Sequence, residues 1–200
     1  IVGCAPITFS NLQSAKLIDK GKFEYTPSFS SSVNTINYGL QTAYGLSEKY
    51  NLRLRLERIV INVDFEDDTS SFLKLSDFNF NESLIHLSFG LKFQLLENKW
   101  AIYLPISFTK ADNGNNVFKQ IEPTIIYTSS LGKYFELNPS MKTLIPIDSE
   151  YKDLLLAYNI GLGISPNFTQ WVFRSEMGFL STLDLDSIIP HFSIGISIYP

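Results

Sequence analysis

Apolar and polar residues alternate along ten segments of this chain, and that two-residue period limits the folds open to it. From Ile85 to Leu95 every second residue is apolar, and polar or small residues fill the positions between them. Successive side chains of a β-strand point to opposite faces, so each segment predicts a strand with one apolar and one polar face. A strand of about ten residues crosses a lipid bilayer when it is tilted. The pattern therefore predicts an all-β fold, an antiparallel up-and-down transmembrane β-barrel with an apolar outside and a polar inside.

The connections between the predicted strands alternate between short and long. We expect ten strands, at residues 23–29, 36–46, 52–61, 84–95, 100–108, 121–127, 135–141, 154–164, 171–179 and 188–198. Short polar turns stand at 47–49, 97–99, 129–133 and 165–169, and longer connections at 63–82, 110–118, 145–152 and 181–187, with a brief one at 31–35. Outer-membrane barrels have short periplasmic turns and longer outer loops. Near Arg58 the apolar residues change parity, since Ile59 and Ile61 are apolar, and this predicts a β-bulge.

Aromatic residues cluster beside the short turns. The residues at this end are Tyr44, Phe93, Trp100, Tyr127, Phe135 and Trp171, and Phe29, Phe108 and Phe179 fall near the opposite rim. Aromatic rings concentrate at both membrane–water interfaces of membrane proteins. The sequence therefore predicts two aromatic girdles.

The polar faces of the strands distinguish a membrane barrel from a soluble one. A soluble barrel of the fatty-acid-binding type turns its polar face to water, and that face should then be rich in Lys and Glu. Here it is rich in Gly and Ser, including Gly39, Gly45, Gly90, Gly161, Gly163, Gly178, Gly195, Ser88, Ser193 and Ser197. Small residues suit the cramped interior of a narrow barrel, whereas Gly weakens an exposed strand. The pattern favours the membrane barrel.

Ten charged residues lie on the predicted inward face. They are five acids and five bases: Glu24, Arg53, Arg55, Glu57, Lys92, Glu122, Glu136, Lys142, Arg174 and Glu176. An unpaired charge is costly in a confined site, so opposite charges there should pair and close the lumen. The same residues would also suit a narrow polar channel that selects a small solute or ion. The sequence does not separate these two interpretations.

The sequence contains no recognisable catalytic or cofactor-binding motif, so it gives little support to an enzyme. His86 and His191 lie on the predicted inward face, and Ser83, Ser193 and Glu82 are nearby in sequence, but no motif joins them into a nucleophile–base arrangement. A membrane hydrolase that uses either histidine stays as a second alternative. We expect no cofactor and no metal, and the formal net charge of −4 without a basic patch argues against nucleic acid.

The 63–82 loop is unusually rich in both acidic and apolar residues. Its acidic residues lack the glycine turn and the terminal glutamate of a calcium loop. Its apolar residues, which include Phe65, Phe72 and Phe78, are dense for a free loop. We expect this loop to extend the wall, cover the lumen or bind another envelope protein.

The first twenty residues show no strand alternation. Ser10 is a suitable N-cap for a short helix that ends at Lys20 before Gly21. We expect residues 1–20 to form a tether or a small plug at the barrel mouth, and residues 21–200 to form the barrel domain. Ile1-Val2-Gly3-Cys4 resembles the lipobox of bacterial lipoproteins, in which the cysteine is lipidated. That resemblance implies lipidation at Cys4 and makes residues 1–3 the remnant of a signal peptide.

As a whole, residues 21–199 resemble the small β-barrel proteins of bacterial outer membranes. Tyr199 near the end of the sequence is similar to the terminal aromatic of their assembly signal, although Pro200 follows it. The resemblance implies an outer-membrane location in contact with the lipid bilayer. We expect a non-enzymatic barrel with a largely closed lumen, acting as a structural, accessory or interaction subunit.

Overall fold

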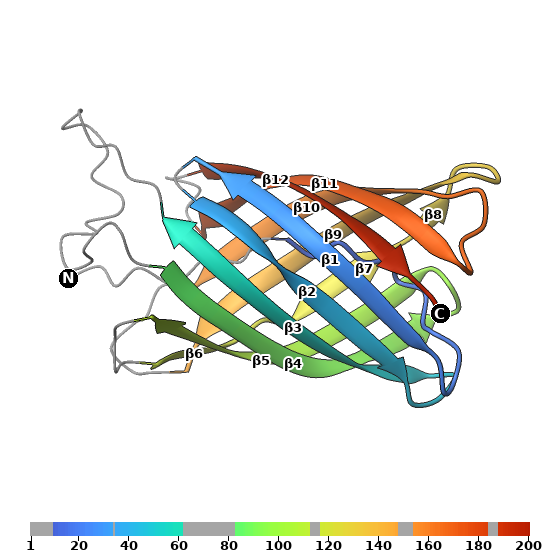
Figure 1. Ribbon diagram of the computed structural model, residues 1–200, viewed down its shortest axis with the longest axis horizontal. Helices are drawn as coiled ribbons and strands as arrows, with labels where there is room; N and C mark the ends of the chain where they lie inside the picture. Colours follow the sequence, from blue (N-terminus) through green and yellow to red (C-terminus); the bar gives the residue numbers. More distant parts are fainter. Residues whose placement is uncertain (1–9, 34, 62–82, 113–116, 148–153, 184–187) are drawn as a thin grey trace.

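The described part of the chain forms one antiparallel sheet that closes on itself (Figure 1). The computed structural model describes residues 10–33, 35–61, 83–112, 117–147, 154–183 and 188–200. Within these ranges the strands are β1 (Phe23–Ser32), β2 (Thr35–Gly45), β3 (Tyr50–Ile61), β4 (Ser83–Leu96), β5 (Trp100–Ala111), β6 (Val117–Ile121), β7 (Thr124–Tyr127), β8 (Ser129–Ser130), β9 (Phe135–Pro146), β10 (Leu155–Ile164), β11 (Trp171–Thr182) and β12 (Ile188–Ile198).

Antiparallel pairing of strands that follow one another along the chain builds most of the wall, and the pairing of β12 with β1 closes it. The strand order is β10-β11-β12-β1-β2-β3-β4-β5-β6-β9, and β9 also pairs with β10. Short strands β6, β7 and β8 follow one another along β9 and together take a single place in the wall. The wall therefore has ten places, and the prediction of an antiparallel up-and-down β-barrel of about ten strands is confirmed.

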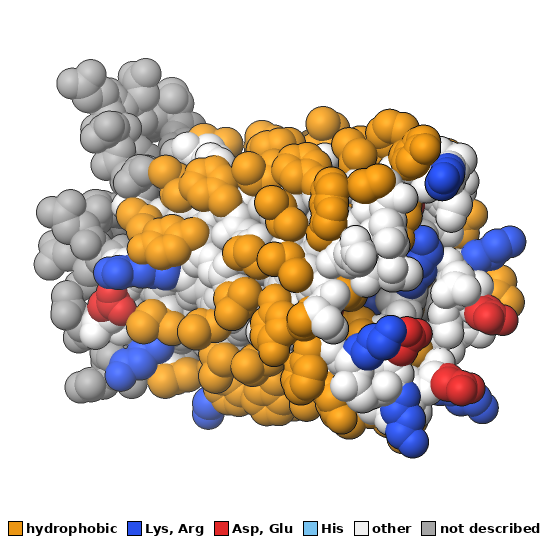
Figure 2. Space-filling model, turned by 45° about the vertical axis from the view of Figure 1, so that its right-hand side comes forward, with side chains coloured by type: hydrophobic (Ala, Val, Ile, Leu, Met, Phe, Trp, Pro, Cys, Tyr) orange, Lys and Arg blue, Asp and Glu red, His pale blue; other side chains and the backbone are white. Residues whose placement is uncertain are grey.

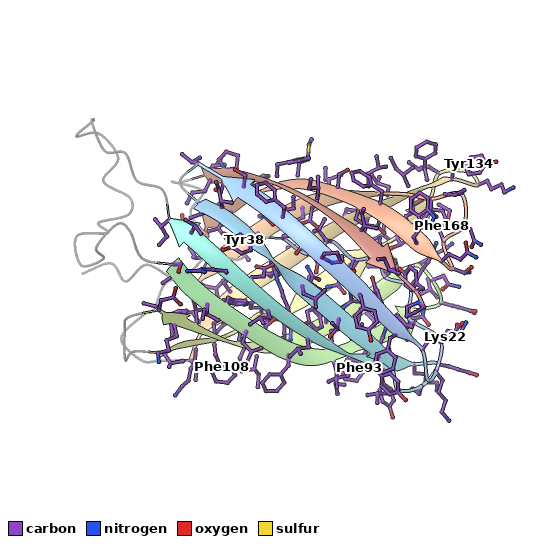
Figure 3. All side chains as sticks on the ribbon, in the orientation of Figure 1. Lys22, Tyr38, Phe93, Phe108, Tyr134 and Phe168 are labelled. Atoms are coloured by element: carbon purple, nitrogen blue, oxygen red, sulfur yellow. The ribbon has the colours of Figure 1, made fainter. Side chains whose placement is uncertain are left out.

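Side chains alternate strictly between the outside and the inside of the barrel. In β3 the outward residues Leu52, Leu54 and Leu56 are 43–50% exposed, whereas Arg53, Arg55 and Glu57 between them are at most 5% exposed. Hydrophobic side chains cover most of the wall in Figure 2, and charged ones gather near its two ends. Phe93 and Phe108 project outward in the same way (Figure 3). A soluble domain has the opposite arrangement, with apolar side chains inside and charged ones outside. A contiguous apolar surface of this size marks a face that contacts lipid or protein.

One end of the barrel is formed by the short turns. Backbone hydrogen bonds close these turns, as between Ser47 N and Tyr50 O at 3.1 Å and between Lys99 N and Leu96 O at 3.0 Å. The six aromatic residues predicted for this end lie there on the outer face, with Trp100, Phe135 and Trp171 about two-fifths exposed. Rings on adjacent strands contact one another, and the ring centroids of Trp100 and Tyr127 are 4.8 Å apart.

The predicted bulge at Arg58 is wrong. Pairing of β3 with both neighbours is unbroken from Asn51 to Val60, and strand alternation continues through Arg58. Arg58 points outward and donates to Ser83 Oγ at 2.8 Å, while Ile59 points inward and is 1% exposed. The Arg58 side chain can point outward because it finds polar partners near the rim, Ser83 and Asp112. The strand therefore keeps its register without a bulge. The register shift in the described sheet instead separates Gln94 from Leu96, opposite Ala101 and Trp100.

The predicted helix between Ser10 and Lys20 is also wrong. Residues 10–18 have no helical or strand structure, and most of them are buried within the barrel. No helix of the described residues has the length and apolar character needed to cross a membrane.

Candidate functional site

The interior of the barrel contains a segment of the chain itself, which we call the plug and define as residues 10–18. Ser10 to Ala15 are at most 6% exposed, and Ile18 is 6% exposed. A turn at Asp19 to Lys22 links the plug to β1, with Lys22 N bonded to Asp19 O at 3.0 Å and Gly21 N to Gly45 O at 2.8 Å. Gly21 has a φ of 81°, a conformation that favours glycine. The plug thus runs from deep in the lumen to the turn end (Figure 1).

Two wall residues, Lys92 on β4 and Glu176 on β11, hold the plug by its backbone. The Glu176 carboxylate accepts Asn11 N at 2.7 Å and Leu12 N at 3.1 Å. The Lys92 ammonium donates to Ser14 O at 2.8 Å and to Lys16 O at 2.7 Å. Leu12 has a φ of 41°, and a left-handed residue lets successive amides converge on one anion. The wall acid therefore accepts hydrogen bonds from amides of the plug, and the wall base donates hydrogen bonds to its carbonyls.

Other wall groups also bind the plug backbone. Arg55 Nη1 donates to Ser10 O at 2.5 Å, and Lys142 Nζ lies 3.3 Å from the same oxygen. Ala15 N donates to Thr128 Oγ1 at 2.7 Å, in the break between β7 and β8. These bonds satisfy buried backbone groups of a segment that has no secondary structure of its own.

Three plug side chains fit particular places on the wall. A Cδ atom of Leu12 lies 3.2 Å from the position that a Cβ would take at Gly195 on β12. Ala15 packs with Ala101, Tyr103 and Ile126 of β5 and β7 in a buried apolar cluster. Lys16 forms a salt bridge of 2.8 Å with Glu136 and lies 4.7 Å from the ring centroid of Phe168 at the turn end.

The ten inward charges predicted from the sequence are all buried, none more than 5% exposed. The ion pairs among them are Arg53–Glu24 at 3.3 Å, Arg55–Glu57 at 2.7 Å, Lys142–Glu122 at 3.4 Å and Arg174–Glu136 at 2.8 Å. Four acids thus pair with four bases. The remaining acid and base are Glu176 and Lys92, which bind the plug backbone.

Small residues on intervening strands allow two of these pairs to form. Gly163 on β10 is paired with Glu136 on β9 and with Arg174 on β11, so the salt bridge passes over a residue without a side chain. A Cβ at Gly163 would lie only 2.6 Å from Glu136 Cγ. Ala43 on β2 separates Glu24 from Arg53 in the same manner. Gly163 and Ala43 are therefore small for two reasons: the interior is narrow, and a larger side chain at either position would separate the two members of an ion pair.

The two histidines lie in separate places. His86 Nδ1 is 2.9 Å from Thr109 Oγ1, and its Nε2 is 3.7 Å from Glu122. His191 on β12 has Nε2 3.8 Å from Glu176, and β1, β2 and β3 stand between β12 and β4. Ser83 is hydrogen-bonded to Asp112 and Arg58 at the rim. In the ranges described, no three His, Cys, Asp or Glu side chains are placed to hold a metal ion.

Tyr199 belongs to the interior network but was not among the predicted lumen residues. Its hydroxyl accepts from Arg174 Nη2 at 3.0 Å and lies 3.5 Å from Glu24 Oε1. Burial raises the pKa of this phenol to about 12. Lys16 and Thr128 were likewise missed, because neither stands in the inward pattern of a predicted strand. Cys4 and the 63–82 loop lie outside the described residues.

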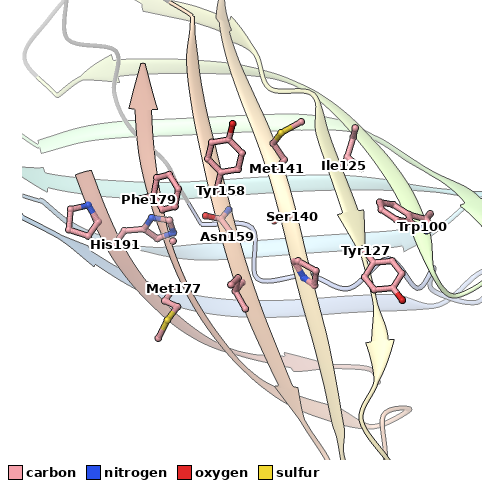
Figure 4. A pocket seen from close by; sticks show the side chains of 14 residues that line it. Trp100, Ile125, Tyr127, Ser140, Met141, Tyr158, Asn159, Met177, Phe179 and His191 are labelled. Carbon is pink, nitrogen blue, oxygen red and sulfur yellow. The ribbon is translucent and has the colours of Figure 1, made fainter. Parts of the chain in front are cut away.

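A second candidate site is an apolar groove on the outer face of the wall (Figure 4). It has a volume of about 810 Å³ and crosses β9, β10 and β11, and Trp100 and Tyr127 lie at one side of it. Tyr158 and Phe179, with ring centroids 5.2 Å apart, form part of its border. Its outward lining is apolar, so it presents few groups that would orient a polar ligand.

No protein-family model and no curated protein sequence matches this chain. Among solved structures, a de novo designed transmembrane β-barrel is similar at 9% identity and a TM-score of 0.40, over 92% of this chain and 98% of that chain. An anion-selective porin from Comamonas acidovorans is similar at 11% identity and a TM-score of 0.38, over 82% and 49%. Ail, the attachment invasion locus protein of Yersinia pestis, is similar at 13% identity and a TM-score of 0.33, over 90% and 99%.

Proposed function

We propose that this protein is a non-enzymatic β-barrel of a bacterial outer membrane, closed by its own plug, that acts as a structural, accessory or interaction subunit. The outward apolar wall supports a position in a bilayer, because exposed leucines such as Leu52 and Leu56 would be unfavourable in water. Acyl chains of the surrounding lipid would fill the outer groove, which therefore needs no protein ligand.

The plug is the main observation in favour of a closed lumen. A barrel of this size has an interior that side chains nearly fill. Here a further nine residues, 10–18, pass through that interior and bond to wall residues from β3, β4, β9 and β11. Such an interior leaves little room for the continuous water column that an open pore requires.

A narrow channel is the second candidate, and one observation favours it. In the described residues, polar atoms of Ser28, Ser30, Asn37, Gln41 and Ser193 are buried without a hydrogen-bond partner. These residues lie together on β12, β1 and β2. Buried polar groups of this kind usually bind water, so a hydrated path would form along these strands if the plug moved. The hydrolase alternative has less support, since His86 and His191 are buried in separate places.

We also propose that the protein is lipidated near its N-terminus and that it binds a partner protein through an outer loop. Lipidation at Cys4 follows from the lipobox resemblance, and a partner protein would bind through residues 63–82. Mass spectrometry of the protein from a Gram-negative host should detect an acyl modification that Cys4→Ser removes. An unmodified Cys4 peptide in a correctly exported protein would contradict lipidation.

Conductance in planar bilayers tests the closed lumen. We expect the full-length protein to show no steady current, and the Gly45→Val variant to show openings. A side chain at Gly45 would collide with the backbone carbonyl of Asp19, and its Cβ would lie 2.7 Å from Ile18 O, where the plug leaves the lumen. Gly161→Ala is the matched control, because the nearest atom to its Cβ would be Asn138 O at 3.2 Å. Steady, salt-dependent openings of the unchanged protein would favour the channel instead.

A further inference from the structure

The wall recognises the plug mainly through atoms that every polypeptide has. Glu176, Lys92, Arg55 and Thr128 all bind backbone amides or carbonyls of residues 10–16. Hydrogen bonds to charged groups are among the stronger ones in proteins. Recognition of this kind does not depend on the covalent link between the plug and β1.

We propose that the lumen is a binding site for a peptide without regular secondary structure, which the plug occupies in cis and which accepts a second peptide of matching pattern in trans. The ligand class is a short stretch of polypeptide, without helix or strand structure, that enters in place of residues 10–18. This proposal adds to the closed lumen of the proposed function. The plug and a second peptide would compete for the same site, and the lumen would be closed by whichever peptide is bound.

Side-chain contacts define the pattern that such a peptide must have. Position 12 takes a bulky aliphatic side chain, because Gly195 leaves space beside Leu12. Position 15 takes a small residue, because Ala15 is completely buried against Ala101, Tyr103 and Ile126. Position 16 takes a base, because Lys16 forms a salt bridge with Glu136 and its ammonium lies over the ring of Phe168.

Glu176 and Lys92 are the two anchors of the site. Glu176 receives two consecutive amides, and Lys92 donates to two carbonyls that flank Ala15. The two anchors therefore fix the direction of the bound chain as well as its register. The other eight inward charges form ion pairs within the wall, whereas Lys92 and Glu176 bind the plug backbone, with His191 Nε2 3.8 Å from Glu176.

The test uses the full-length protein in detergent micelles with a fluorescent nine-residue peptide of sequence 10–18. Ala15→Leu overfills the buried cluster and should displace the plug in cis, so this variant should bind the peptide in an anisotropy titration. The unchanged protein, whose site is occupied, should bind it at least roughly tenfold more weakly, as should Ala15→Leu combined with Lys92→Met and Glu176→Gln. A peptide that itself carries leucine at position 15 is the matched control and should not bind.

Folding of each variant is checked by its heat-modifiable migration in gels. Should Ala15→Leu fail to fold, Lys16→Glu replaces it, because a carboxylate beside Glu136 should also loosen the plug. Lack of binding to a folded, plug-displaced variant would overturn the proposal, and so would equal binding of a scrambled peptide. Because the titration needs neither a bilayer nor a current, its result is independent of whether the intact protein conducts.

Discussion

At the scale of single residues, the buried ion pairs determine which substitutions are costly. Arg55 is 5% exposed and bonds to both Glu57 and the Ser10 carbonyl, so Arg55→Ala leaves the Glu57 carboxylate buried without its partner. Loss of one member of a buried pair typically costs about 3–5 kcal/mol. We expect the free energy of unfolding of Arg55→Ala in urea, measured in lipid vesicles, to fall by that amount.

Lys99→Ala is the control for this comparison. Lys99 lies in an exposed turn, and a surface substitution away from such contacts usually changes stability by less than about 0.5 kcal/mol. Equal unfolding midpoints for the two variants would contradict the buried role of Arg55.

The inward position of each lumen charge could be read from the sequence, but its partner could not. Alternation is local, so parity alone indicates that Glu136 and Arg174 share a face. Their salt bridge depends on strand register, because both residues must lie opposite Gly163 on the strand between them. Register is set by the whole closed sheet, and a short sequence window does not contain that information.

At the scale of elements, strands were predicted well because each carries its own period, whereas the plug carries none. Ser10 satisfied the rule for a helix N-cap, yet the segment has no helix. A short isolated helix is only marginally stable, and the wall groups bind the backbone amides and carbonyls that a helix would pair internally. Tertiary contacts thus override a local helix signal.

The wall opposite β9 shows a second limit of local patterns. The sequence predicts one strand over 121–127, but β6 begins earlier, at Val117, and ends at Ile121, and the wall resumes as β7 at Thr124 and β8 at Ser129. Pro123 has no backbone N–H to donate. Its carbonyl accepts from Thr143 N at 2.9 Å, and Glu122 N donates to Pro105 O at 3.0 Å. Residues at the two breaks, Glu122–Pro123 and Thr128, still form contacts inside the barrel. Glu122 forms an ion pair with Lys142, and Thr128 accepts a hydrogen bond from the plug.

At the scale of the whole molecule, the two tryptophans report whether lipid surrounds the wall. Trp100 and Trp171 are 41% and 40% exposed on the outer face near the turn end. Aromatic rings at such positions lie at the level of lipid headgroups. In vesicles we expect both to be quenched more strongly by lipids brominated near the headgroup than by lipids brominated near the chain ends.

Single-tryptophan proteins make this prediction specific to the girdle. Trp100→Phe leaves Trp171, Trp171→Phe leaves Trp100, and both residues pair with neighbours at the same end of the barrel, Tyr127 and Ile198. Because a barrel fixes both side chains at one level of its axis, the two proteins should give the same depth of quenching. Water-like emission without quenching by either lipid would mean that water, not lipid, surrounds these rings, and it would overturn the membrane assignment while leaving the barrel fold intact.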